Sequence, residues 1–252
     1  MNVVVCVKHV PDPNAPVEMQ DKRVKRDGQG VLDPGDTYGI EAGLVLKEAL
    51  GGEVTVVSMG PAQAVEAVKR ALSMGADRGV MISDDALEGA DSLLTARVLA
   101  AAIRRADFDL VVAGVESTDG YTGTMPSSLA EFLGIPQVTF ARGLDASAAS
   151  ITVDRQTADG YHVVECPLPA LITVTAGANE PRYPSFKGIM AAKKKPLEHL
   201  ALGDLEISAA DAEVKQEIVA ISSVDERKSG EGVAEDEAAA RIADLLAEVK
   251  VI

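Results

Sequence analysis

An alternation of apolar strands with helical segments constrains the fold of this chain more than any other feature. Residues 3–7 are apolar at every position and mostly β-branched, which is the pattern of a strand buried on both faces. Further strands are expected at residues 53–58, 79–82, 109–113 and 136–141. Strand–helix repetition of this kind requires a parallel sheet with helices on both faces. We therefore predict an α/β fold built on a doubly wound parallel sheet.

Turn and capping residues indicate where the helices between these strands begin and end. Asp36 follows the turn residues Asp33, Pro34 and Gly35, and it is predicted to cap a helix over residues 37–50. Other helices are expected after Gly60 as far as residue 75, and over residues 91–106 and 125–133.

The pattern changes after residue 150. Residues 151–166 predict a β-hairpin, residues 168–175 an apolar strand and residues 186–192 a short helix. A smaller hairpin is expected around Asp27 and Gly28. The acidic C-terminal part ends in an amphipathic helix over residues 236–251. We divide the chain into an α/β domain (1–200), which includes the hairpin 150–166 and a basic loop at 181–196, and an acidic linker with a C-terminal helical arm (201–252).

Residues 109–126, DLVVAGVESTDGYTGTMP, form the most informative single stretch. They predict a buried strand that ends at Gly114, a loop of small and polar residues, and a helix that begins near Pro126. Loop N–H groups and the positive end of the helix dipole would then suit an anion. Parallel sheets bind ligands at this edge, at a topological switch point. The loops that begin at Lys8 and Met59 are expected to reach the same edge. The alternative is a connection that binds nothing, but such connections average only about 4–6 residues.

Charge and apolar content exclude several classes of protein. The net charge of −15 argues against general nucleic-acid binding. No run of about 18 apolar residues is present, so we expect no membrane insertion. The first residues lead into a strand without a signal-peptide pattern, which favours a cytoplasmic protein. Cys6 and Cys166 lie in apolar strands and are expected to be buried, reduced thiols.

The familiar catalytic motifs do not occur. The loops match neither a Walker A sequence nor a full GxGxxG sequence, and Ser117 lies outside a GxSxG elbow. The chain has four Phe, four Tyr and no Trp, which does not favour a self-contained flavin pocket. The residues alone therefore predict a nucleotide-binding α/β protein without an active site of its own.

Five motifs together resemble one family, the beta subunit of electron transfer flavoprotein. The resemblance covers about residues 1–200, and its motifs recur in the family's order. They are VVVCVKHVPD, SMGPAQAVEAVKRALSMGADRGV, DLVVAGVESTDGYTGTMPSSLAEFLGIPQVT, VDRQTADGYHVVECPLPALITV and NEPRYPSFKGIMAAKKKP.

The resemblance implies an electron carrier rather than an enzyme. The family is a heterodimer whose single FAD is held mostly by the alpha subunit, and in most members the beta subunit binds a structural AMP. Such a protein would accept electrons from acyl-CoA-type dehydrogenases, as in fatty acid β-oxidation, and pass them to a membrane quinone oxidoreductase. The sheet would then be an adenine-nucleotide-binding domain.

The resemblance also implies which residues bind. Carried over by position, the AMP site comprises Cys6, Asp33, Pro34, Gly35, Asp36, Met59, Gly114, Val115, Glu116, Ser117, Thr118, Asp119, Gly120, Tyr121, Thr122, Gly123, Thr124 and Met125. The segment that docks on dehydrogenases comprises Pro184, Phe186, Ile189, Met190, Lys193, Lys194 and Lys195. Phe186 stands where many relatives have Leu, as the apolar anchor. The lysines would dock the partner or hold the loop, where composition alone indicates a solvated helix end.

Two alternatives stay open. Electron-bifurcating members of the family place a second FAD in the AMP pocket and use NADH as the donor. A different class is the homodimeric adenine-nucleotide-binding stress or signalling protein.

Asp33 departs from the family's pattern, because many members have Asn at this position. Since an acid beside a phosphate is unfavourable, we expect Asp33 to face the ribose or adenine, or to cap the helix.

Overall fold

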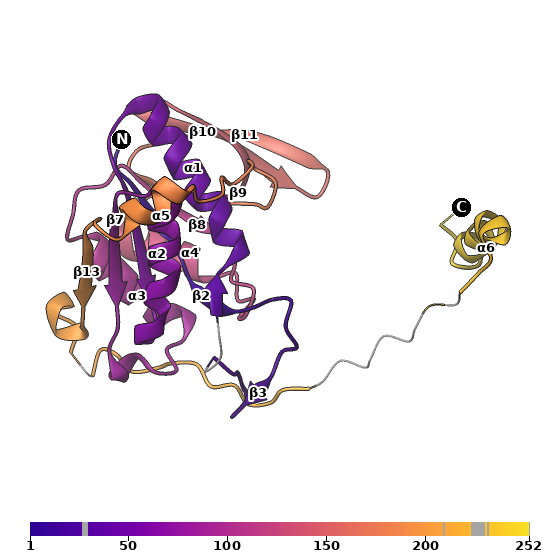
Figure 1. The fold of residues 1–252 in the computed structure, drawn as a ribbon, viewed down its shortest axis with the longest axis horizontal. Helices are drawn as coiled ribbons and strands as arrows, with labels where there is room; N and C mark the ends of the chain where they lie inside the picture. Colours follow the sequence, from indigo (N-terminus) through magenta and orange to yellow (C-terminus); the bar gives the residue numbers. More distant parts are fainter. Residues whose placement is uncertain (27–29, 209, 223–229, 231, 252) are drawn as a thin grey trace. The chain divides into compact units, whose positions relative to one another are not determined.

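The computed structural model describes residues 1–26, 30–208, 210–222, 230 and 232–251 (Figure 1). The chain divides into a large unit, Met1–Ile218, and a small unit, Val219–Ile252. The large unit therefore continues beyond residue 200. The turn expected around Asp27 and Gly28 lies outside the described residues.

A nine-stranded sheet forms the centre of the large unit among the described residues. Its strand order is β11-β10-β9-β12-β8-β1-β6-β7-β13. The strands are β1 (Val3–Cys6), β6 (Val54–Met59), β7 (Arg78–Ile82), β8 (Leu110–Gly114), β9 (Gln137–Ala146), β10 (Ser150–Thr157), β11 (Gly160–Pro167), β12 (Ala170–Val174) and β13 (Leu197–Leu200). All neighbouring pairs are parallel except β9–β10 and β10–β11. The predicted α/β fold with an antiparallel hairpin is confirmed.

Helices cover both faces of this sheet (Figure 1). One apolar cluster joins α1 (Pro34–Leu50) and α2 (Val65–Met74) to one face. The other joins α3 (Ser92–Ile103) and α4 (Met125–Leu133) to the opposite face. The central strands β1, β8 and β12 are buried at every position, as strands covered on both sides must be. Short 3-10 helices lie at η1 (Ala62–Ala64), η2 (Asp85–Leu87) and η3 (Leu202–Leu205).

The strand order reverses between β1 and β8. From β1 the chain proceeds through β6 to β7 on one side, and then crosses back to place β8 on the other side of β1. The register pairs Val3 with Leu110 and Val5 with Val112, so the loops after both strands leave the same edge. This is the switch point at which α/β sheets bind ligands.

Smaller elements surround this edge and the helices. A two-stranded sheet pairs β2 (His9–Pro11) with β5 (Gly30–Leu32), and another pairs β3 (Met19–Gln20) with β4 (Arg23–Val24). The predicted short helix is α5 (Phe186–Ala192), which packs on α2 (Figure 1). The small unit holds α6 (Glu235–Glu248). Among the described residues, no helix combines the length and apolarity needed to cross a bilayer.

Strand β7 depends on a glycine where it lies between α2 and the edge strand β13. A Cβ on Gly79 would lie 2.5 Å from Val68 Cγ1 and 3.0 Å from Leu197 Cδ1. We expect Gly79→Ala to lower the free energy of unfolding by about 1–3 kcal/mol, because the side chains of α2 and β13 must move apart. Urea denaturation measures the change.

Gly203→Ala is the matched control, because a Cβ there has no atom within 4 Å among the described residues. Its effect should stay within about 0.5 kcal/mol. Equal effects of the two substitutions would contradict the packing described for β7.

Candidate functional site

Asp33 joins the start of α1 to the 114–125 loop. Its side chain is fully buried and accepts hydrogen bonds from Gly35 N (2.9 Å), Thr118 N (2.8 Å) and Thr118 Oγ1 (3.1 Å). Asp33 is thus the N-cap of α1, which confirms one of its expected roles. The prediction that Asp36 caps this helix was wrong, because α1 begins three residues earlier than expected, at Pro34.

Asp36 instead connects α1 to the two strands of the switch point. It accepts a 2.7 Å hydrogen bond from Lys8 N after β1, and the backbone of Gly114 at the end of β8 also hydrogen-bonds to it. Burial and the charge of Asp33 raise the pKa of Asp36 well above its usual value. A Cβ on Gly114 would lie 2.8 Å from Asp36 Oδ1, so a residue with a side chain cannot replace this glycine without a shift.

Asp119 of the 114–125 loop forms ion pairs with two cations. Its side chain is 3% exposed and pairs with Lys8 Nζ at 2.6 Å and Arg26 Nε at 2.7 Å. Lys8 Nζ also donates to Ser117 Oγ at 3.2 Å. Burial would raise the pKa of Asp119, but Lys8 and Arg26 outweigh this effect and lower it. The loop is therefore tied to β1 and to the segment that follows β4.

The exposed part of the loop presents backbone donors. Residues 120–124 are exposed, and the N–H groups of Gly120, Thr122, Gly123 and Thr124 find no acceptor among the described residues. Gly123 has a φ of +62°, a conformation that favours glycine. Free N–H groups beside Lys8 and Arg26, at the start of α4, are suited to bind a phosphate.

The remaining predicted site residues lie around this edge. Cys6, Met59 and Met125 pack in the cluster on the α3 and α4 side. Burial, with the charge of Asp36 adding to it, raises the pKa of the Cys6 thiol to about 12. Tyr121 is 66% exposed with a φ of +47°. Pro34 and Gly35 form the first turn of α1, and Val115 and Glu116 begin the loop.

A cavity of about 660 Å³ lies outside the 114–125 loop, since no residue of this loop lines it. It shares Pro34 with the predicted site, and its polar lining includes His9, Tyr38, Arg70 and Arg182. None of these four was among the predicted site residues, because each comes from a different part of the chain.

Residues 179–195, which we call the α5 segment, present an apolar surface. Tyr183 is 90% exposed, Phe186 81%, Ile189 44% and Met190 49%. Pro184 is half-buried, whereas Lys193 and Lys194 are exposed. Lys195 turns inward, and its Nζ donates to the carbonyl oxygens of Leu72 and Ala76.

Reasoning from sequence missed the cations that order both regions. Lys8 lies in a loop that was expected to reach the site, but neither it nor Arg26 and Arg182 was named as a site residue. Their partners lie 93 to 141 residues away along the chain. For Lys8, the sequence did offer a signal, because this basic residue directly follows a predicted strand.

Comparison with known proteins gives an independent finding. The sequence model of the family described as "Electron transfer flavoprotein domain" matches residues 22–205. Electron transfer flavoprotein subunit beta of Thermoanaerobacterium thermosaccharolyticum is 38% identical over 237 residues, which are 92% of this chain and 91% of the relative. The subunit of the same name from Mycobacterium tuberculosis is 37% identical over 264 residues, covering 100% and 99%. Caffeyl-CoA reductase-Etf complex subunit CarD of Acetobacterium woodii is 40% identical over 201 residues, covering 78% and 77%.

The Asp119 ion pairs predict a specific pH dependence. Because the folded pKa of Asp119 is lowered, its contribution is present above the unfolded value of about 3.9 and is lost as pH falls through the folded value. We expect Asp119→Asn to lower the free energy of unfolding by about 1–2 kcal/mol at pH 7, since both cations are partly exposed. The difference from the native chain should shrink below about pH 5.

Urea denaturation of both chains from pH 7 to about pH 2, which passes through the lowered folded pKa, measures this difference. Asp107→Asn, at an exposed aspartate, is the control and should be neutral at every pH. A loss that stays constant over this pH range would show that the ion pairs do not cause it.

Proposed function

Because this chain belongs to the electron transfer flavoprotein family, among its beta subunits, we propose that it forms a heterodimer with an alpha subunit and serves as an electron carrier. The pair accepts electrons on one FAD from acyl-CoA-type dehydrogenases and passes them to a membrane quinone oxidoreductase. The beta subunit does no bond chemistry of its own. It binds AMP, supports the flavin held mostly by alpha, and docks the dehydrogenase.

The geometry of the 114–125 loop is the observation that carries this proposal. Two cations and a row of free N–H groups converge at the switch point, which supports binding of the AMP phosphate there. Asp33 and Asp36 are engaged below the loop in hydrogen bonds, and Asp119 is neutralised by its two partners. Their carboxylates therefore oppose a phosphate less than the sequence alone indicates.

The adenosine would lie towards the neighbouring strand ends. Cys6, Met59 and Met125 offer an apolar wall on the α3 and α4 side, and an adenine can stack on aliphatic and thioether groups. The Cys6 thiol stays protonated at neutral pH because its pKa is raised, so it acts as part of this wall rather than as a nucleophile.

Dehydrogenases would dock on the α5 segment. Four large apolar side chains are exposed within eight residues, and two exposed lysines, Lys193 and Lys194, adjoin them. Phe186 is the most exposed large apolar residue of α5 and the natural anchor for a partner's apolar pocket.

A second candidate is the electron-bifurcating form, with a second FAD in the AMP pocket and NADH as the donor. The similarity to CarD, a subunit of a caffeyl-CoA reductase-Etf complex, supports this second candidate. Family membership removes the homodimeric stress or signalling protein from consideration.

Co-expression with the alpha subunit tests the assembly. We expect the two chains to co-purify as a 1:1 complex that carries FAD, because alpha holds most of the flavin and beta completes its site. Size-exclusion chromatography with the visible flavin spectrum measures both properties. A beta chain that forms a stable homodimer and ignores alpha would contradict the proposal.

Phe186→Ala tests the docking. A central aromatic anchor is commonly worth at least 2 kcal/mol, so the apparent KM of the dehydrogenase for the heterodimer should rise by about 30-fold. The flavin and nucleotide contents should not change. Leu50→Ala, at an exposed apolar residue of α1 (41%), is the control and should leave KM unchanged. An unaltered KM in the Phe186 variant would show that the partner docks elsewhere.

A further inference from the structure

Helix α5 is ordered although none of its residues is buried. It has seven residues, and its large apolar side chains point away from the core. A helix of this length is not stable in water by itself. Contacts outside the helix must therefore hold it in place.

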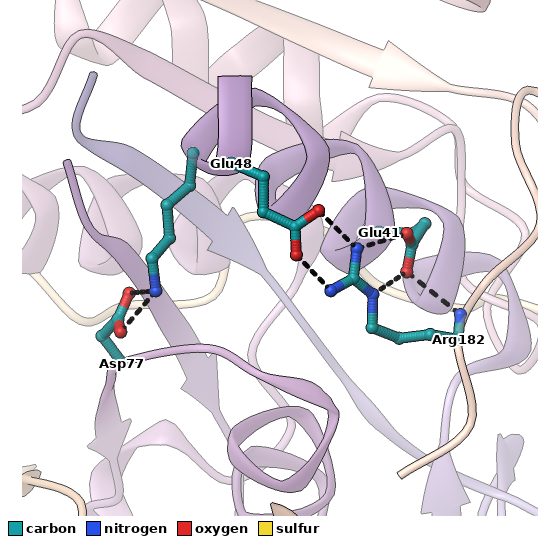
Figure 2. A network of polar contacts seen from close by, with 5 residues as sticks. Glu41, Glu48, Asp77 and Arg182 are labelled. Carbon is teal, nitrogen blue, oxygen red and sulfur yellow. Dashed lines mark hydrogen bonds and ion pairs between the residues drawn. The ribbon is translucent and has the colours of Figure 1, made fainter. Parts of the chain in front are cut away.

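Arg182 fixes the segment before α5 to helix α1 (Figure 2). Its Nε and Nη2 donate to the two oxygens of Glu41 at 2.8 Å each, and its backbone N donates to Glu41 Oε2 at 3.0 Å. Its Nη1 reaches Glu48 Oε1 at 2.5 Å. Asn179 Nδ2 adds a 2.9 Å hydrogen bond to the carbonyl oxygen of Tyr38. Tyr38, Glu41 and Glu48 of α1 thus hold this part of the chain.

The charges at this contact stabilise one another. The Glu41 side chain is 8% exposed, and Arg182 compensates it through a forked pair of hydrogen bonds. The bonds from both glutamates raise the pKa of Arg182, and the Arg182 bond lowers the pKa of Glu48. Lysine cannot reproduce this geometry, because it lacks the planar fork.

Lys195 fixes the other end of the segment to helix α2. Its Nζ donates to the carbonyl oxygens of Leu72 (2.9 Å) and Ala76 (2.6 Å), where α2 ends. A cation is favoured at this negative end of the helix dipole. Lys195 is half-buried, and this burial lowers its pKa.

Between Arg182 and Lys195, helix α5 packs so closely on α2 that it cannot move nearer to it. A Cβ on Gly188 would lie 2.5 Å from the carbonyl oxygen of Ser73. Ser185 caps α5 by accepting a 3.0 Å hydrogen bond from Gly188 N. The backbone of α5 therefore lies directly on the last turn of α2.

We infer that Arg182 and Lys195 are positioning residues that fasten the two ends of α5 to α1 and α2, so that Phe186, Ile189 and Met190 are held in the docking conformation before a partner arrives. This inference rests on the proposed docking function. Neither residue needs to touch the partner. Without the anchors, the partner would have to order the segment as it binds, and the apparent affinity would fall with the fraction of competent helix.

Variants of the FAD-loaded heterodimer test this inference. Arg182→Ala and Lys195→Ala should each raise the dehydrogenase KM about tenfold, as expected if a tenth of the molecules keep a competent α5, with kcat unchanged. Hydrogen exchange at residues 183–192 should accelerate in both variants. Arg182→Lys should give an intermediate KM. Arg97→Ala and Lys215→Ala, which break ion pairs away from α1, α2 and α5, should change neither readout.

A double-mutant cycle with Phe186→Ala separates positioning from general stability. If the anchors act by presenting Phe186, then Arg182→Ala should add little to the KM of the Phe186→Ala variant. Additive effects, or unchanged exchange at residues 183–192, would overturn the inference. An unaltered KM in the Phe186→Ala variant would instead refute the docking function. If the KM rises in that variant but stays native in Arg182→Ala and Lys195→Ala, only the anchoring role is refuted.

Discussion

Two buried carboxylates at the start of α1 are the interaction on which the sheet edge at the 114–125 loop depends. A buried acid must be hydrogen-bonded, and Asp33 and Asp36 meet this need with donors from the ends of β1 and β8 and from the 114–125 loop. The same bonds fix the direction of that loop and require glycine at position 114. Within the described part of the chain, the N–H groups of Gly120 and residues 122–124 have no acceptor, and Lys8 and Arg26 pair with Asp119 of the same loop.

Helix α1 supports both functional regions. Gly39 and Gly43 let it approach β1 closely, since a Cβ at either would lie 3.2 to 3.4 Å from valines of the sheet. Its N-cap Asp33 holds the 114–125 loop, whereas Glu41 and Glu48 hold the α5 segment through Arg182. A rigid helix thus connects the site proposed for AMP with the surface proposed for the dehydrogenase.

Elements with a strong local signal were predictable from sequence, and long-range contacts were not. Helices α4 and α5 were predicted with their observed bounds, and Pro126 marks the first turn of α4. Strand β13 was missed, since its four residues show no alternation and depend on pairing with β7. Asp33 and Asp36 both fit a capping pattern, and only the structure, in which Asp33 accepts a hydrogen bond from Gly35 N, shows that Asp33 is the cap. The Arg182 anchor was unforeseen, because its partner lies 141 residues earlier.

The nucleotide content of the purified heterodimer tests the central claim most directly. Acid extraction followed by chromatography would identify every bound nucleotide and its ratio to protein. One FAD and one AMP per heterodimer are expected if the 114–125 loop holds a structural nucleotide and only one flavin carries electrons. Two FAD without AMP, together with flavin reduction by NADH, would contradict this account and favour the bifurcating form.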